Sequence, residues 1–203
     1  MDNNENIRKR YNRIAKYFDS MEKPMGTSGF DKWRKELVQQ ATGKTLEVGV
    51  GTGKNLQYYA KDVDLTAIDF SENMLDKART KYKDDLPKMN FLEMDVQNMD
   101  FEDNSFDTVL TSCVFCSVPD PVKGLQEIKR VMKTDGQLIM LEHVRSSNKV
   151  LGLFMDLFNF IPLNIIGDNI NRRTAENLKK AGFTNTKETK LWMDVVKFFH
   201  VKN

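Results

Sequence analysis

The stretch LEVGVGTGKN, from Leu46 to Asn55, decides the fold class of this chain. Glycines stand at alternate positions 49, 51 and 53, directly after a short apolar run that contains Glu47. Glycine loses more backbone freedom on folding than any other residue, so this density is costly inside a regular element. The stretch predicts a strand, a tight turn that a ligand approaches closely, and a helix that begins near Gly53.

Outward from this turn, short apolar strands alternate with segments of helical periodicity. Strands are predicted at 45–50, 64–69, 90–95, 106–113, 135–144, 184–192 and 194–201. Helices are predicted at 5–18, 30–40, 72–82, 119–133 and 171–183. This alternation is typical of a parallel sheet with right-handed crossovers, and the last two strands can pair as a hairpin. The predicted fold class is α/β: a doubly wound, Rossmann-like, seven-stranded and mostly parallel sheet with an antiparallel C-terminal edge hairpin, preceded by N-terminal helices.

Composition narrows the classes of function. The 203 residues include 31 basic and 29 acidic side chains, and a net charge of +2 gives no reason to expect a nucleic acid partner. The two cysteines, Cys113 and Cys116, are too few for a four-ligand zinc site or a disulfide framework, so we predict no metal. The polar N-terminus and the lack of a long apolar run predict a cytoplasmic protein without a signal peptide or membrane span.

We expect one domain over residues 1–203, with four parts. They are a helical cap at 1–43, a cofactor-binding core at 44–145, an apolar lid or insert at 146–170, and a C-terminal helix and hairpin at 171–203.

The glycine turn and Asp69 together predict a nucleoside ligand. Asp69 ends the second predicted strand, where a carboxylate can bind the two hydroxyls of a ribose. A dinucleotide fingerprint needs glycine at position 54, but this chain has Lys54. A buried Glu47 beside the turn would repel a pyrophosphate and could help to hold an ammonium group. S-adenosylmethionine has an ammonium group, a ribose and no phosphate. A nicotinamide-dependent oxidoreductase and a non-catalytic nucleoside-binding module stay open as alternatives.

At this point the sequence resembles a known family, the class I S-adenosylmethionine-dependent methyltransferases. LEVGVGTGKN is similar to the family's first motif and LTAIDFSENML to the stretch that follows it. MDVQNMDFEDNSFDTVLTSCVF resembles the next two motifs, and GLQEIKRVMKTDGQLIMLEHV the helix and strand after them. The resemblance covers about Lys44 to Val144. Within the family it is strongest to the quinone C-methyltransferase and bacterial phospholipid N-methyltransferase branch, with some similarity to small-thiol methyltransferases.

The resemblance implies roles for individual residues toward S-adenosylmethionine. Glu47, Gly49 and Gly51 would surround the methionine part, with Gly53 completing the turn, while Asp69 would bind the ribose hydroxyls. Phe70 and Met74 would border the adenine, Asp95 would accept from its amino group beside the Val96 backbone, and Ser112 would lie near the sulfonium. A tyrosine-rich leader helix often closes over the cofactor in this branch. Of Tyr11 and Tyr17, we expect one to face the core and the other to close over the methionine part.

Methyl transfer itself needs mainly alignment and a dry pocket, because the sulfonium is already activated. His143 ends the fifth strand and is a candidate general base, although a structural histidine fits equally well. Tyr17 is the other catalytic candidate. SCVF stands after the fourth strand in place of a DPPY-like motif, which disfavours methylation of nucleic acid bases. A small-molecule or lipid acceptor is therefore expected.

The acceptor is expected to enter beside the aromatic segment at 150–166. Leu151, Phe154, Leu157, Phe158 and Ile161 follow the spacing of one helical face. An ordinary core helix would show the same pattern. The aromatic density and the basic face of the leader helix favour an apolar acceptor and peripheral contact with a membrane. The oligomeric state is left undetermined by the sequence.

Overall fold

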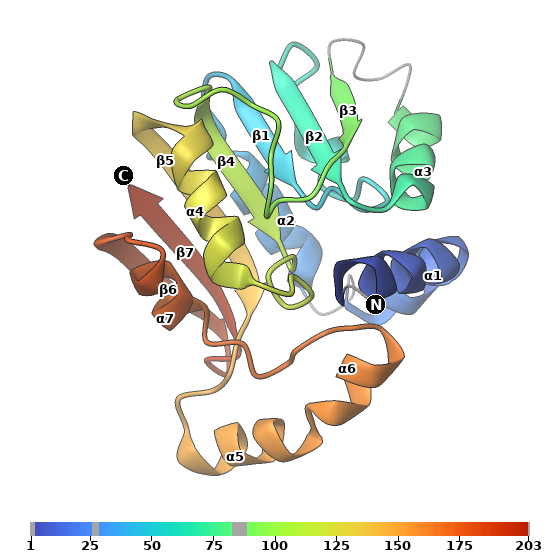
Figure 1. Cartoon of the computed structure of the whole chain (residues 1–203), viewed down its shortest axis with the longest axis vertical. Helices are drawn as coiled ribbons and strands as arrows, with labels where there is room; N and C mark the ends of the chain where they lie inside the picture. Colours follow the sequence, from blue (N-terminus) through green and yellow to red (C-terminus); the bar gives the residue numbers. More distant parts are fainter. Residues whose placement is uncertain (1–2, 26–28, 83–88, 203) are drawn as a thin grey trace.

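The computed structural model describes residues 3–25, 29–82 and 89–202, which are built around one seven-stranded sheet (Figure 1). The strands lie in the order β3-β2-β1-β4-β5-β7-β6. Their bounds are β1 Thr45–Val48, β2 Leu65–Asp69, β3 Asn90–Glu93, β4 Phe106–Ser112, β5 Met132–His143, β6 Asn185–Trp192 and β7 Val196–Lys202. Strands β1 to β5 are parallel, and β7 runs antiparallel to β5 and β6. The predicted fold class is confirmed.

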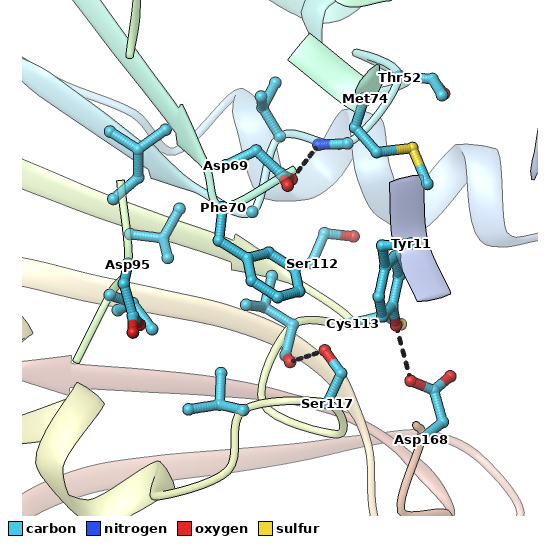
Figure 2. Close-up of a pocket in the computed structure, with 18 of the residues that line it drawn as sticks. Tyr11, Thr52, Asp69, Phe70, Met74, Asp95, Ser112, Cys113, Ser117 and Asp168 are labelled. Atoms are coloured by element: carbon cyan, nitrogen blue, oxygen red, sulfur yellow. Dashed lines mark hydrogen bonds between the residues drawn. The ribbon is translucent and has the colours of Figure 1, made fainter. Parts of the chain in front are cut away.

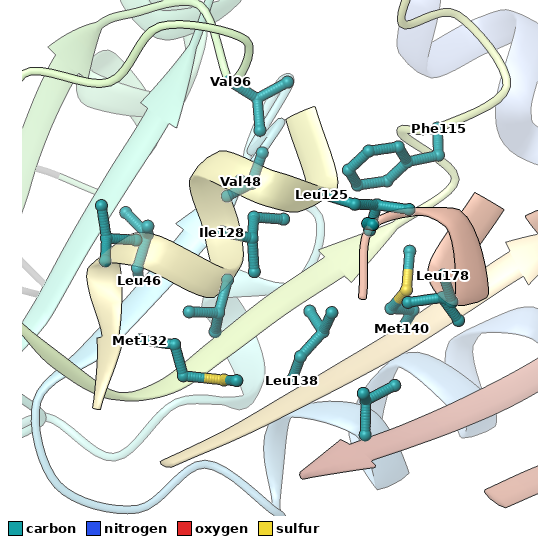
Figure 3. Packing of buried hydrophobic residues seen from close by; sticks show 14 of the residues in the cluster. Leu46, Val48, Val96, Phe115, Leu125, Ile128, Met132, Leu138, Met140 and Leu178 are labelled. Carbon is teal, nitrogen blue, oxygen red and sulfur yellow. The ribbon is translucent and has the colours of Figure 1, made fainter. Parts of the chain in front are cut away.

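Helices cover both faces of this sheet. They are α1 Asn3–Met25, α2 Asp31–Val38, α3 Glu72–Tyr82, α4 Pro121–Val131, α5 Lys149–Phe158, α6 Phe160–Ile165 and α7 Thr174–Lys180. The first hydrophobic cluster lies between the sheet and α4 and α7 (Figure 3). The second lies between the opposite face and α2 and α3. Neighbouring residues of β4 divide between the two, with Val109 in the first and Leu110 in the second, because successive strand side chains point to opposite faces.

Helix α4 shows how local sequence produces one of these layers. Asp120 caps the helix by accepting from the Lys123 backbone N–H at 3.0 Å, and Pro121 occupies the first turn, where its missing N–H costs nothing. Leu125 and Ile128 lie three residues apart on the inner face and are fully buried. Truncating either leucine-sized side chain to alanine would cost about 2–5 kcal/mol of stability.

The order of the strands creates a switch point between β1 and β4. The connections from β1 through α3 to β3 pack on one face of the sheet, whereas the connection from β4 through α4 to β5 packs on the other. The chain therefore leaves the carboxyl ends of β1 and β4 in opposite directions. Ligands of doubly wound sheets bind in the crevice that results.

Two predicted helices differ from those in the structure. No α-helix follows the glycine turn: a single 3-10 turn, Leu56–Tyr58, stands in place of the helix predicted from Gly53. Positive φ angles persist to Gly53, and the backbone is already extended at Tyr59 (φ −74°, ψ 149°), which ends the 3-10 turn after three residues. Helix α1 instead runs past its predicted end at residue 18, as far as Met25.

The predicted aromatic segment forms two short helices, α5 and α6, which meet at Asn159. They project from the lower end of the molecule in Figure 1, away from the sheet. In the described part of the chain, no helix has both the length and the apolarity required to cross a bilayer.

Candidate active site

A cavity of about 280 Å³ opens at the carboxyl ends of the parallel strands (Figure 2). Gly49 follows β1, Asp69 ends β2, Ser112 ends β4 and His143 ends β5, and all four line it. Helix α1 supplies a further wall, with Tyr11 among its contributions. The cavity therefore occupies the crevice that the strand order predicts.

The three glycines of the turn have different surroundings. Gly49, Gly51 and Gly53 all have positive φ angles, of 67°, 56° and 82°, a region in which other residues are strained. A Cβ on Gly51 would meet nothing within 4 Å, so this backbone borders open space in the cavity. A Cβ on Gly53 would come within 2.9 Å of the Tyr82 ring, and Gly53 does not line the cavity. Gly53 thus serves the packing of the turn on α3, and Gly49 and Gly51 face the ligand side.

Asp69 is a buried carboxylate at the cavity wall. Its Oδ2 accepts from the Gly51 backbone N–H at 2.8 Å and its Oδ1 from that of Ser71 at 2.9 Å. Burial raises the pKa of Asp69 to about 6, although these backbone donors lower it. Each carboxylate oxygen can accept a second hydrogen bond, so Asp69 can still bind a pair of vicinal hydroxyls.

Beyond Asp69, the cavity has apolar walls and a second carboxylate. Phe70, Met74 and Val96 line it, as does Asp95. Asp95 accepts from Asn4 Nδ2 at 2.7 Å and from the Gln97 backbone N–H at 2.8 Å. A flat heteroaromatic ring with an exocyclic amine suits such walls, because the ring packs on apolar side chains and the amine meets a carboxylate.

Ser112 has a buried hydroxyl that lines the cavity and has no hydrogen-bond partner among the described residues. Buried polar groups are almost always paired, so an orphaned hydroxyl in a cavity wall indicates a ligand atom beside it. Cys113, the next residue, has a positive φ of 54° and turns the chain away from β4 at this wall.

Glu47 lies behind the glycine turn and does not line the cavity. Its Oε1 accepts from Asn55 Nδ2 at 2.9 Å, and Arg34 donates to the amide oxygen of Asn55 at 3.2 Å. Burial raises the pKa of Glu47 to about 7, with smaller opposing contributions from Tyr59, Asn55 and Arg34. Arg34 comes from α2 and does line the cavity, so this wall contains a cation that the sequence did not identify.

The two tyrosines of the leader helix lie in different environments. Tyr11 lines the cavity, packs edge-on against Phe70 with ring centroids 5.6 Å apart, and donates to Asp168 Oδ1 at 2.8 Å. Tyr17 is 61% exposed and does not border the cavity. The structure therefore places Tyr11, but not the catalytic candidate Tyr17, where the cofactor is expected.

Polar contacts hold α1 over the cavity. Asn12 accepts from Ser71 Oγ at 2.6 Å at the start of α3. Asp19 accepts from Thr52 Oγ1 at 2.6 Å in the glycine turn. With the bond from Asn4 to Asp95, these contacts connect one helix to three loops that follow strands. Helix α1 closes this side of the cavity.

His143 lies at the far wall, close to two residues that sequence reasoning missed. Burial lowers the pKa of His143, and the charge of Asp168 partly opposes this effect. Asp168 lines the cavity from the loop after α6. Glu142, next to His143, is fully buried and accepts from Thr111 Oγ1 at 2.9 Å, and burial raises its pKa to about 7. Only the fold brings these residues together.

Comparison with known proteins identifies the family. Residues 46–140 match a methyltransferase domain model. A ubiquinone/menaquinone biosynthesis C-methyltransferase from Citrifermentans bemidjiense is 30% identical over 172 residues, which cover 80% of this chain and 72% of that protein. The chain belongs to the S-adenosylmethionine-dependent methyltransferases.

This methyltransferase is also similar to a second sequence relative and to a solved structure. A phosphatidylethanolamine N-methyltransferase from Cereibacter sphaeroides is 39% identical over 108 residues, which cover 52% of this chain and 53% of the relative. The chain thus spans about half the length of that relative. A solved structure of an S-adenosylmethionine-dependent methyltransferase from Aquifex aeolicus superposes with a TM-score of 0.67 at 20% identity, covering 92% of this chain and 97% of the other. This last likeness concerns the fold.

The cofactor of the methyltransferase is S-adenosylmethionine, and the cavity has the chemistry to hold it. Gly51 leaves space beside the backbone, the Asp69 carboxylate has the acceptor oxygens that ribose hydroxyls need, and the Ser112 hydroxyl has no hydrogen-bond partner among the described residues. When bound, the cofactor supplies an electrophilic methyl group on a sulfonium. Lys54 in place of a third glycine agrees with this cofactor and not with a dinucleotide.

Proposed function

We propose that this methyltransferase acts on an apolar, lipid-like acceptor that reaches the cavity from the side of α5 and α6. The observation that carries the proposal is the apolar surface of these two helices. It comprises nine exposed large side chains, namely Val150, Leu153, Phe154, Leu157, Phe158, Phe160, Ile161, Leu163 and Ile165. A soluble surface rarely has such a contiguous patch without a partner.

The side chains of α5 are not buried as those of an ordinary core helix would be. Within α5 only Gly152 and Met155 are buried, whereas Phe154 is 57% and Leu157 66% exposed. The chain then passes from α6 directly into the cavity wall, where Ile166 lies. An acceptor that rests on these helices would therefore be close to the methyl group.

The leader helix adds positive charge beside this surface. Arg10 of α1 donates to the Leu163 carbonyl of α6 at 2.6 Å. Arg13 and Lys16 are exposed on the same helix. Cationic side chains next to an exposed apolar face are typical of proteins that bind the surface of an anionic bilayer. The proposal includes such peripheral contact.

The names of the relatives support an acceptor of this kind. One methylates phosphatidylethanolamine and the other acts in quinone biosynthesis, by their names. The acceptor classes proposed for this chain are accordingly a phospholipid amine, a quinone or an apolar thiol. Transfer would be a direct in-line attack, for which the protein provides alignment and exclusion of water.

For the cofactor, we assign the ribose hydroxyls to Asp69 and the adenine to the pocket of Phe70, Met74 and Asp95. Arg34 is placed to bind the carboxylate of the methionine part, because it is a buried cation at the cavity wall near the glycine turn. Tyr11 would cover the methionine part from above.

The test compares methyl transfer to an acceptor in vesicles with transfer to a water-soluble analogue of the same acceptor. A panel of phospholipid amines, quinones and alkyl thiols is screened first. We expect Phe154→Ser/Phe158→Ser to lose about tenfold in kcat/KM with the vesicle acceptor only. Leu92→Ser, at an exposed apolar position on β3, is the matched control and should retain activity. Equal losses with both forms of the acceptor, or none with either, would contradict entry along α5 and α6.

A further inference from the structure

Three side chains with metal-binding atoms meet at the far wall of the cavity. Cys116 comes from the loop after β4, His143 from the end of β5 and Asp168 from the loop after α6. One ligand atom from each lies within 4.8 Å of the other two. Cys116 is only 2% exposed and lies behind the wall, whereas His143 and Asp168 line the cavity.

The spacing of these atoms fits one small ion. At Zn–ligand lengths of about 2.0–2.3 Å, tetrahedral ligands lie roughly 3.3–3.8 Å apart, so the three atoms need to approach one another by only about 1 Å. Catalytic zinc sites have three protein ligands and keep the fourth position open. We propose that Cys116, His143 and Asp168 bind one zinc-like divalent cation, with its open coordination position toward the cavity.

The surrounding charges favour a cation here. Glu142 lies close enough to raise the pKa of the Cys116 thiol further, and its Oε2 has no hydrogen-bond partner among the described residues. The nearby cation, Arg172, donates to the Phe115, Cys116 and Val118 carbonyls, so the peptide dipoles of that loop already solvate its charge. Two carboxyl groups and a thiol therefore lie beside a single cation whose charge the loop carbonyls already solvate.

The thiol and Asp168 are also prepared for ligation. Cys116 would bind a metal ion as the thiolate, with release of the thiol proton. Its S–H now points to the Cys113 carbonyl, at 3.2 Å. Tyr11 donates to Oδ1 of Asp168, and the same carboxylate lies within hydrogen-bond reach of the Cys116 thiol. Hydrogen bonds of this kind orient ligating carboxylates in metalloproteins.

The metal site also indicates which methyl acceptor the enzyme uses, and this step rests on the proposed function. An apolar thiol would bind at the open position as a thiolate, with its proton released to solvent, because sulfur is a preferred ligand of zinc. The bound sulfur would then face the sulfonium methyl group across the cavity. Among the three proposed acceptor classes, the site therefore favours the thiol.

The prediction of no metal from the sequence rested on counting cysteines. The three proposed ligands lie 27 and 25 residues apart (143 − 116 and 168 − 143), so no short motif contains them. A three-ligand site of mixed residue types needs the fold to bring it together.

Cobalt titration of the full chain tests the site. The purified protein is freed of metal with a chelator and titrated with Co²⁺, then with Zn²⁺ as competitor. We expect one equivalent of Co²⁺ and a thiolate-to-cobalt charge-transfer band, both displaced by one equivalent of Zn²⁺. Cys116→Ser should lose the band, and Asp168→Asn and His143→Gln should weaken binding at least tenfold. Cys113→Ser is the matched control and should keep both band and affinity.

Binding of S-adenosylhomocysteine, measured on the same samples, shows whether each variant is folded. A wild-type chain that binds S-adenosylhomocysteine but takes up no stoichiometric Co²⁺ would overturn the metal site and leave the proposed function standing. So would a band that disappears in Cys113→Ser and survives in Cys116→Ser. Conversely, stoichiometric metal with no transfer to any apolar acceptor would contradict the proposed function alone.

Discussion

Helix α1 lines the cavity itself, whereas α5 and α6 lead into its wall through Ile166 and Asp168, and the two helical regions are attached in different ways. Helix α1 is attached by polar bonds along its length, from Asn4 to Asp19, and these bonds reach three loops of the cofactor side. Helices α5 and α6 are attached near their ends instead. Asp156 accepts two N–H groups of Arg145 at 2.8–3.1 Å, and Asn159 donates to Asn169 at 3.2 Å.

These two kinds of attachment suit different ligands. A helix with many directional bonds to strand-end loops can hold a polar cofactor in one position. A helix pair with an apolar outer face has no directional preference and suits an acceptor that varies along its hydrocarbon part. The comparison predicts that changes in the two regions will separate cofactor binding from acceptor and membrane binding.

The largest expected effect comes from removing residues 1–20. The deletion takes away Tyr11, Ile14 and Phe18 from the cavity wall. We expect affinity for S-adenosylhomocysteine to fall about 100-fold, or about 2.8 kcal/mol, as measured by calorimetry. Vesicle binding through the apolar face of α5 and α6 should be reduced far less. Unchanged cofactor affinity would mean that α1 is not a lid.

Asp69→Ala should have the next largest effect. It removes hydrogen bonds from ribose hydroxyls to a charged acceptor, each worth about 1.5–3 kcal/mol, so cofactor affinity should fall about 10- to 100-fold. Vesicle binding should not change. Asp62→Ala, at an exposed carboxylate before β2, is the control. Equal affinity in the two variants would remove Asp69 from the site.

Phe154→Ser/Phe158→Ser tests the other region. The two rings lie 4.3 Å apart at the surface, and burying one phenylalanine in an apolar medium is worth about 1.5–3 kcal/mol. We expect binding to anionic vesicles, measured by sedimentation, to weaken at least tenfold at both low and high salt, because both rings are lost. Affinity for S-adenosylhomocysteine should stay as in the wild type, and Leu92→Ser should behave as the wild type in both assays. Loss of cofactor affinity in the double variant would contradict the prediction that α5 and α6 act on vesicle binding alone.

The glycine-turn side of the cavity and the α5 region should respond to pH with opposite signs. Burial raises the pKa of Glu47 from the ordinary value of 4.5 to about 7, so its contribution to stability is fully present below pH 4.5 and is lost as the pH rises from there to about 7. The Arg145 hydrogen bond lowers the pKa of Asp156, so that contribution is present at neutral pH and is lost on acidification. We expect the melting temperature, measured from pH 3 to 8, to fall less steeply toward basic pH in Glu47→Gln than in the wild type. In Asp156→Asn it should fall less steeply toward acidic pH. A change toward acidic pH in Glu47→Gln and toward basic pH in Asp156→Asn would contradict both predictions.

The smallest effect is expected for Tyr11→Phe. The variant loses the bond to Asp168 and keeps the ring against Phe70. We expect cofactor affinity to fall about threefold, since a hydrogen bond of this kind contributes on the order of 1 kcal/mol net. Tyr17→Phe should leave it unchanged. An equal loss in the two variants would show that the Tyr11 hydroxyl has no special role.

Local patterns were sufficient to predict the sheet and the residues at the ends of its strands. Asp69, Asp95 and Ser112 follow apolar runs directly, and parallel strands bring their carboxyl ends to one edge. Helix α3 was predicted at its observed bounds, because Ser71 precedes a periodic run. The roles of these residues toward the cofactor stay predictions.

Other features depend on contacts between distant parts of the chain. Arg34 and Asp168 lack a motif, and only packing brings them to the cavity. Tyr11 and Tyr17 are six residues apart, about 240° around a helix, so periodicity could not tell which one faces the ligand. The helix predicted after Gly53 does not form, because the backbone becomes extended at Tyr59, directly after a single 3-10 turn.

The direction of β7 has a practical consequence for measuring this protein. Strand β7 runs antiparallel to β5, with Val196 beside His143 at the cavity end of the sheet. Its last residue, Lys202, therefore lies at the opposite end of the strands (Figure 1). A fluorophore or surface linker joined after Lys202 would leave both the cavity and the apolar helices facing solvent. The same attachment on α1 would lie beside the cavity. Immobilising the chain through the Lys202 end of β7 therefore leaves the cavity and helices α5 and α6 free to contact a bilayer.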